Sequence, residues 1–91
     1  MAFLVTRRGE DPDLDTRQYE LQAGLNLDPV REKLRSSISK HSAVASCTIT
    51  TEGKSEVVTV RKLTGIDWDS TDVNRYVLGH INAAAQKASG R

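Results

Sequence analysis

The sequence predicts a small α+β domain in which an antiparallel sheet packs against two helices, in the order ββαββα. Three observations lead to this prediction. Ninety-one residues are enough for one domain with one hydrophobic core, spanning residues 1–91. Two groups of short β-prone segments are each followed by a segment with helical apolar spacing. Both helices are expected on one face of the sheet, because their apolar stripes must be buried against it.

The first hairpin is the least determined part of the chain. Residues 2–6 form a short β-prone run, and residues 8–16 predict an exposed acidic loop rich in turn residues. From Arg17 to Leu27, apolar and polar residues alternate, which is typical of a strand. A helix beginning near Asp11 is the alternative for residues 12–24, but it would leave Tyr19 outside the apolar stripe. We therefore prefer a strand that pairs with the first one.

The first helix is expected to begin at Asp28 and Pro29. An aspartate accepts hydrogen bonds from the unpaired amides of a first turn, and proline is tolerated at the first helical position. Val30, Leu34 and Ile38 recur at four-residue spacing and predict a narrow buried stripe.

A second hairpin follows. Ala45, Cys47 and Ile49 alternate with serine and threonine, which predicts a strand with one buried face. Gly53 is suited to the tight turn between Glu52 and Ser55, because it adopts positive φ without steric cost.

The return strand is expected to end near Lys62. It buries Val58 and Val60, and Val57 lies on the opposite face. Leu63 breaks the alternation, which indicates a bulge or the end of the strand.

The last helix is expected to begin after Asp69, which would cap it, with Trp68 and Val73 packed across the cap. Its predicted stripe consists of Val73, Tyr76, Val77, His80, Ile81, Ala84 and Ala88. Leu78 lies off this stripe, and Gly79 weakens the helix by roughly 1 kcal/mol relative to alanine. Residues 89–91 are expected to form a frayed end.

The composition excludes several classes of protein. Thirteen basic and twelve acidic side chains give a net charge of +1, so there is no overall polyanion-binding signature. No apolar run reaches membrane-spanning length, and the single cysteine excludes an intramolecular disulfide framework. We expect an intracellular, cytoplasmic protein that does not bind membranes, or a virion protein if a phage encodes it.

No segment predicts a catalytic, cofactor-binding or metal site. The possible metal ligands His41, Cys47 and His80 are scattered, without the close pairs that zinc sites use. The acidic run from Asp67 to Asp72 lacks the glycine and glutamate of a calcium loop. Glycine spacings of phosphate-binding loops are absent as well. A small enzyme or enzyme subunit is therefore only the third hypothesis.

The second hypothesis is a nucleic-acid-binding domain, in which the first helix and the second hairpin would present a basic face. The residues concerned are Arg31, Lys33, Arg35, Lys40, Arg61 and Lys62. A solvated amphipathic surface explains the same charges. Trp68 and Tyr76 have the positions of core residues, so no aromatic side chain is expected beside these lysines and arginines to stack on nucleotides.

The preferred hypothesis is a non-catalytic protein–protein interaction or assembly module, whose partner is another protein or a second copy of the chain. Acidic loops lie apart in sequence from the basic first helix, which suits complementary contacts. Val57 on the outer face of the hairpin and Leu78 off the helical stripe are the predicted partner-binding residues. The alternative for both is that they cover a second small apolar cluster.

The helix–hairpin–helix order from Pro29 to Ala85 is similar to that of small phage head–tail joining proteins. The hairpin from Cys47 to Leu63, with its turn at Gly53, carries the resemblance together with the helix start at residues 70–73. The first 27 residues and the loop from Gly65 to Asp69 depart from the family pattern. The resemblance concerns topology and implies a role in assembly only by analogy.

Overall fold

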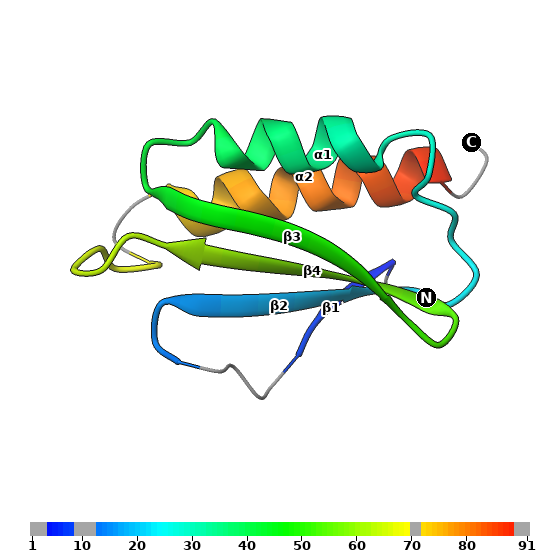
Figure 1. The fold of residues 1–91 in the computed structure, drawn as a ribbon, viewed down its shortest axis with the longest axis horizontal. Helices are drawn as coiled ribbons and strands as arrows, with labels where there is room; N and C mark the ends of the chain where they lie inside the picture. Colours follow the sequence, from blue (N-terminus) through cyan, green and yellow to red (C-terminus); the bar gives the residue numbers. More distant parts are fainter. Residues whose placement is uncertain (1–3, 9–12, 70–71, 89–91) are drawn as a thin grey trace.

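The computed structural model describes residues 4–8, 13–69 and 72–88. Its elements are β1 (Val5–Arg7), β2 (Thr16–Leu21), α1 (Arg31–Ser39), β3 (Val44–Glu52), β4 (Ser55–Lys62) and α2 (Val73–Ala88). The four strands form one antiparallel sheet in the order β1-β2-β4-β3. Both helices lie side by side on the same side of the sheet (Figure 1). The predicted α+β class and ββαββα order are confirmed.

The first hairpin forms as expected, with Val5 of β1 opposite Leu21 of β2. The strand is shorter than its alternation suggested, because the chain turns after Leu21. Gly24 takes φ of +92° in this turn and donates its amide proton to the carbonyl of Lys54 at 3.0 Å. Residues 9–12 of the predicted acidic loop, and the predicted frayed end at 89–91, lie outside the described residues.

The first helix begins at Arg31, so the prediction that Asp28 caps it is wrong. A turn precedes the helix instead, in which the amide of Val30 donates to the carbonyl of Leu27. Asp28 lies in that turn and forms an ion pair with Arg31 at 2.9 Å. The predicted stripe is correct in substance, since Leu34 and Ile38 are buried.

The second hairpin closes through a two-residue turn in which Gly53 has φ of +62°, between the paired residues Glu52 and Ser55. A register shift between Val44 and Ser46 changes the alternation at the start of β3. Ala45 is therefore exposed, contrary to prediction, and Val44 is buried in its place. On β4, Val58 and Val60 face the helices and are buried, and the strand ends at Lys62 as expected.

The last helix begins at Val73, four residues after Asp69, which is therefore not its cap. The amide of Asp69 instead donates to the carboxylate of Asp67 at 2.9 Å. Trp68 and Val73 both enter the core, as the spacing suggested.

The core is one cluster between the sheet and the helices. β2, β3, β4, α1 and α2 contribute to it, together with Leu27, Ala43 and Trp68 from three connecting loops. Its largest fully buried members are Tyr19, Leu21, Leu27, Ile38, Val58, Val60, Val73, Val77 and Ile81. Tyr76 and His80 of the predicted stripe are only half-buried, and Ala85 is buried in addition.

Gly79 is exposed on α2, and a β-carbon added there would have no atom within 4 Å. No segment therefore approaches so closely that position 79 would have to be glycine. We predict that Gly79→Ala stabilises the protein by about 1 kcal/mol, because alanine lowers the entropy of the unfolded chain. Equilibrium urea unfolding measures the change. A destabilised variant would show that the position needs glycine for a reason absent from this structure.

Candidate protein-docking site

Neither predicted partner-binding residue is a free apolar anchor. Val57 does lie on the sheet face away from the helices, but its side chain is 0% exposed. Of the two alternatives for Val57, an exposed anchor or a covered apolar residue, the first is therefore excluded. Glu20 and Thr50 lie directly opposite Val57 on the two neighbouring strands. Leu78 is half-buried and packs against the core. A role of either residue in partner binding stays a prediction.

The predicted basic residues do not converge on one face. α1 covers one side of the sheet, whereas Arg61 points to the other side, away from Lys62. Lys33 and Lys40 of α1 are exposed.

The two arginines of α1 are already paired with carboxylates. Arg31 binds Asp28 and the buried Glu56, each at 2.9 Å. Arg35 donates to Glu32, and this hydrogen bond lowers the pKa of Glu32 and raises that of Arg35.

The possible metal ligands pack against other side chains of the protein, Cys47 inside the core and the two histidines against Tyr76. Burial raises the pKa of the Cys47 thiol to about 11, so it is protonated and unreactive at neutral pH. The rings of His41 and His80 both contact Tyr76, at centroid distances of 4.7 and 4.5 Å. Within the described residues, no three potential ligands are grouped to hold a metal ion.

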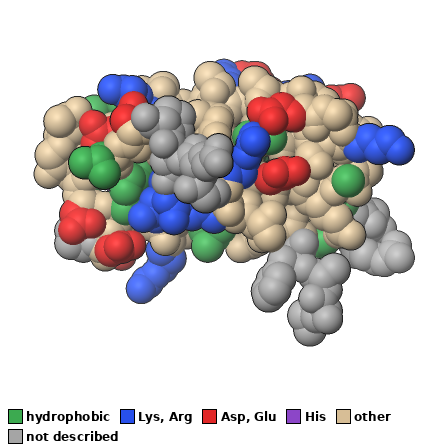
Figure 2. Space-filling model, turned by 90° about the horizontal axis from the view of Figure 1, so that it is seen from below, with side chains coloured by type: hydrophobic (Ala, Val, Ile, Leu, Met, Phe, Trp, Pro, Cys, Tyr) green, Lys and Arg blue, Asp and Glu red, His purple; other side chains and the backbone are tan. Residues whose placement is uncertain are grey.

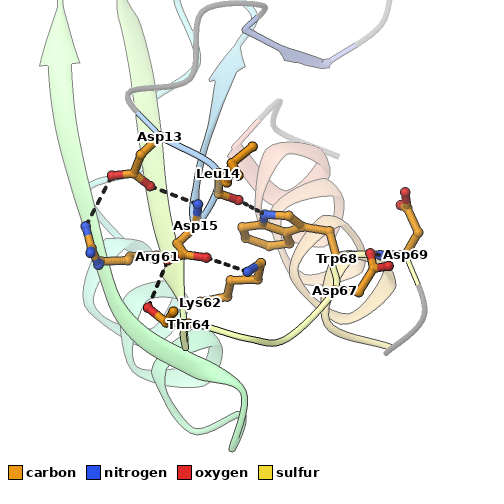
Figure 3. A network of polar contacts seen from close by, with 9 residues as sticks. All are labelled: Asp13, Leu14, Asp15, Arg61, Lys62, Thr64, Asp67, Trp68 and Asp69. Carbon is orange, nitrogen blue, oxygen red and sulfur yellow. Dashed lines mark hydrogen bonds and ion pairs between the residues drawn. The ribbon is translucent and has the colours of Figure 1, made fainter.

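A polar cluster lies at the end of the sheet where β2 begins and β4 ends (Figure 3). The ammonium group of Lys62 donates to Oδ1 of Asp15 at 2.6 Å, and the hydroxyl of Thr64 donates to Oδ2 at 2.9 Å. The backbone amide of Lys62 also donates to the carbonyl of Asp15 at 2.8 Å. Lys62 is only 5% exposed, so its charge depends on this carboxylate.

The pKa of Asp15 is lowered, first by the hydrogen bond from Lys62 and then by that from Thr64. Both donors favour the ionised carboxylate. The pair joins the segment before β2 to the end of β4, which lie 47 residues apart in the sequence.

Trp68 forms the second half of the cluster. Its indole N–H donates to the carbonyl of Leu14 at 3.0 Å. The guanidinium of Arg17 lies 4.8 Å from the centre of the indole ring, and the ammonium of Lys62 lies 5.9 Å away. Asn74 holds Arg17 in place by accepting a hydrogen bond at 3.0 Å. The ring is thereby fixed by one hydrogen bond and two cations.

These contacts fix the backbone of Leu14, although the residue remains 90% exposed. Its carbonyl accepts from Trp68, and the amide of the next residue, Asp15, donates to Oδ1 of Asp13 at 2.8 Å. Asp13 is in turn paired with Arg61 at 3.4 Å. The turn at 13–15 is thus held on both sides of an outward-pointing leucine.

A hollow lies beside this leucine, and the residues lining it are Leu14, Asp15, Lys62, Thr64, Gly65, Ile66, Asp67 and Trp68. Leu63, the neighbour of Thr64 in the sequence, is 43% exposed. Figure 2 shows apolar and acidic side chains side by side at the left end of the molecule, the end where these loops lie in Figure 1. We call Leu14, Leu63, Ile66 and Trp68, with the exposed Asp67 and Asp69, the end patch.

Sequence reasoning missed this cluster. It assigned Asp15 to an exposed acidic loop and Lys62 to a basic surface. One signal was available, since Lys62 has the same strand parity as the buried Val58 and Val60 and should therefore point inward. No local pattern indicated its partner, because Asp15 is distant in sequence.

Comparison with protein-family models and with curated proteins finds no match to this chain. Within the described residues, no helix has the length and apolar character that crossing a membrane requires.

We predict that Asp15→Asn destabilises the protein more than Lys62→Met does. The first change leaves a buried ammonium without its carboxylate, whereas the second replaces the ammonium with an apolar side chain of similar length. Asp13→Asn is the matched control, because it changes the exposed neighbour and keeps a side-chain oxygen for the turn. Thermal unfolding at neutral pH gives the order, and the reverse order would contradict a buried charge pair.

The lowered pKa of Asp15 also predicts how the stability difference between wild type and Asp15→Asn changes with pH. Because the folded pKa of Asp15 is lowered, its stabilisation is complete above the carboxyl pKa of the unfolded chain, about 3.9. It is lost as the pH falls through the folded value. The stability difference between wild type and Asp15→Asn should therefore be constant near neutral pH and should become smaller below about pH 4. A difference that persists in acid would exclude ionisation of Asp15 as its source.

Proposed function

We propose that this protein is a non-catalytic binding module that docks a partner protein on the end patch. The observation that carries the proposal is a leucine that is 90% exposed although its backbone is held in a fixed position. Exposing a leucine gives no advantage to folding, since burial of such a side chain contributes roughly 1.5–3 kcal/mol. A partner that covers Leu14 gains this contribution.

The geometry around Leu14 supports binding rather than chance exposure. A preorganised apolar anchor beside a hollow resembles the hot spots of protein interfaces, where little entropy is lost on association. Ile66 and Trp68 line the hollow, and Trp68 is a residue type enriched in such positions. The hydrogen bond from Trp68 to the carbonyl of Leu14 fixes the two sides of the site relative to each other.

Charge indicates the chemistry of the partner. Asp13 and Asp15 are paired with Arg61 and Lys62. Asp67 lines the hollow and accepts a hydrogen bond from the amide of Asp69, and both of these acidic residues are exposed. A complementary partner segment would place one apolar side chain in the hollow and a lysine or arginine near the acidic Asp67 and Asp69. This is a protein or peptide surface, and nucleic acid would be repelled by the same carboxylates.

Selection of peptides from a displayed random library against the intact chain tests the proposal. We expect enriched peptides that combine an apolar residue with a basic one, and chemical-shift changes at Leu14, Gly65, Ile66 and Trp68. Leu14→Asp should weaken binding by about tenfold or more, because it removes the anchor without touching the core.

The matched control is Asn82→Asp, which adds the same charge at an exposed position of α2 and should leave binding unchanged. Peptides whose binding is insensitive to Leu14→Asp, or whose shifts lie on another surface, would refute the end patch as the docking site.

A further inference from the structure

The open edge of β3 is an unused pairing surface. β3 is an outer strand of the sheet and, with nine residues, the longest of its strands. Its register with β4 runs through to the two-residue turn, where Glu52 and Ser55 are paired. In an antiparallel ladder, the residues of one strand direct their backbone groups alternately toward either neighbour. The N–H and C=O groups of Cys47, Ile49 and Thr51 therefore point to the open edge.

The hydrogen bonds elsewhere in the sheet agree with this alternation. Arg8 donates to the carbonyl of Gln18 and Gln22 donates to that of Leu4, so the even residues of β2 bond to the β1 side. The odd residues of β2 then bond to β4, which leaves the odd residues of β4 for β3. Among the described residues, no loop, turn or helix bonds to the open backbone groups of β3.

The two edges of the sheet differ in how they are protected. β1 has only three residues and ends in Arg7, followed by Arg8, and short charged edges discourage further pairing. β3 contains neither proline nor a charged residue between Val44 and Thr51, and its one irregularity lies near its first residue. Such a long uncharged edge readily accepts another strand.

We propose that β3 pairs with β3 of a second copy of this chain, antiparallel about a twofold axis. Ser46, Thr48 and Thr50 are exposed on the outer face, and threonines opposite one another on paired strands stabilise a sheet. Antiparallel pairing also brings Glu52 of one copy toward the end of β3 that Lys40 precedes in the other, which is favourable in charge. The product is a continuous eight-stranded sheet.

The end patch stays free in this dimer, because it lies beside β2 and β4 rather than at the edge of β3. Each dimer would then present two docking sites. The pairing buries only one strand edge on each copy, so the association is expected to be weak and dependent on protein concentration.

Sedimentation equilibrium over a wide concentration range tests this pairing. The wild type should approach twice the monomer mass at high concentration. Thr48→Lys combined with Thr50→Lys should stay monomeric, as should the corresponding glutamate pair, because like charges meet across the axis. An equimolar mixture of the lysine and glutamate variants should regain the dimer mass.

Thr6→Lys is the control, because it places a lysine on the same face at the other edge of the sheet, and it should dimerise as the wild type does. Circular dichroism unfolding confirms that each variant is folded. A wild type that remains monomeric at its highest soluble concentration would overturn the proposal. So would a lysine variant that dimerises normally, or a mixture that does not associate. Leu14→Asp should dimerise normally, so this result is independent of the end patch.

Discussion

The ammonium group of Lys62 is the constraint around which one end of this molecule is arranged. It is nearly excluded from water, and a buried charge without a partner costs several kcal/mol. Asp15 supplies that partner at 2.6 Å and is itself held by Thr64. The segment before β2 must therefore stay against the end of β4, and the loop after β4 must pass beside both.

Two other contacts follow from this arrangement. The indole of Trp68 lies beside the ammonium and donates to the carbonyl of Leu14, so the loop before α2 is joined to the turn before β2. Arg17 covers the same ring while bonded to Asn74 of α2. The cluster thus connects β2, β4 and α2 through side chains at the surface end of the core. Leu14 is exposed between Asp13 and Asp15, which are held by Arg61 and Lys62.

The sequence predicts most of the fold because alternation and helical spacing are local properties. Val58 and Val60, Leu34 and Ile38, and Val77 and Ile81 are buried as their spacing requires. The errors occur where a nonlocal or irregular feature overrides the pattern. The register shift at Val44 exposes Ala45, and a turn displaces the start of α1 beyond Asp28. Val57 is buried on the outer face of β4, where Thr59 and Arg61 are not, so alternation alone does not account for it.

The candidate site was less predictable than the fold. Lys62 shows inward parity in the sequence, but nothing local identifies Asp15 as its partner or Trp68 as its neighbour. Leu14 stands between two aspartates in an acidic segment, so composition assigns it to a loop and gives no indication that its backbone is fixed. Only the assembled sheet brings these segments together, because their proximity depends on the pairing of β2 with β4.

The most direct test of the fixed end patch is hydrogen exchange at the indole N–H of Trp68, followed by NMR in the intact protein. The hydrogen bond to the carbonyl of Leu14 predicts exchange well below that of an exposed indole at neutral pH. Loss of the Asp15 carboxylate, in Asp15→Asn, should accelerate it. Exchange at the rate of a free indole in the folded wild type would contradict the account, because Leu14 would then lack its anchored backbone.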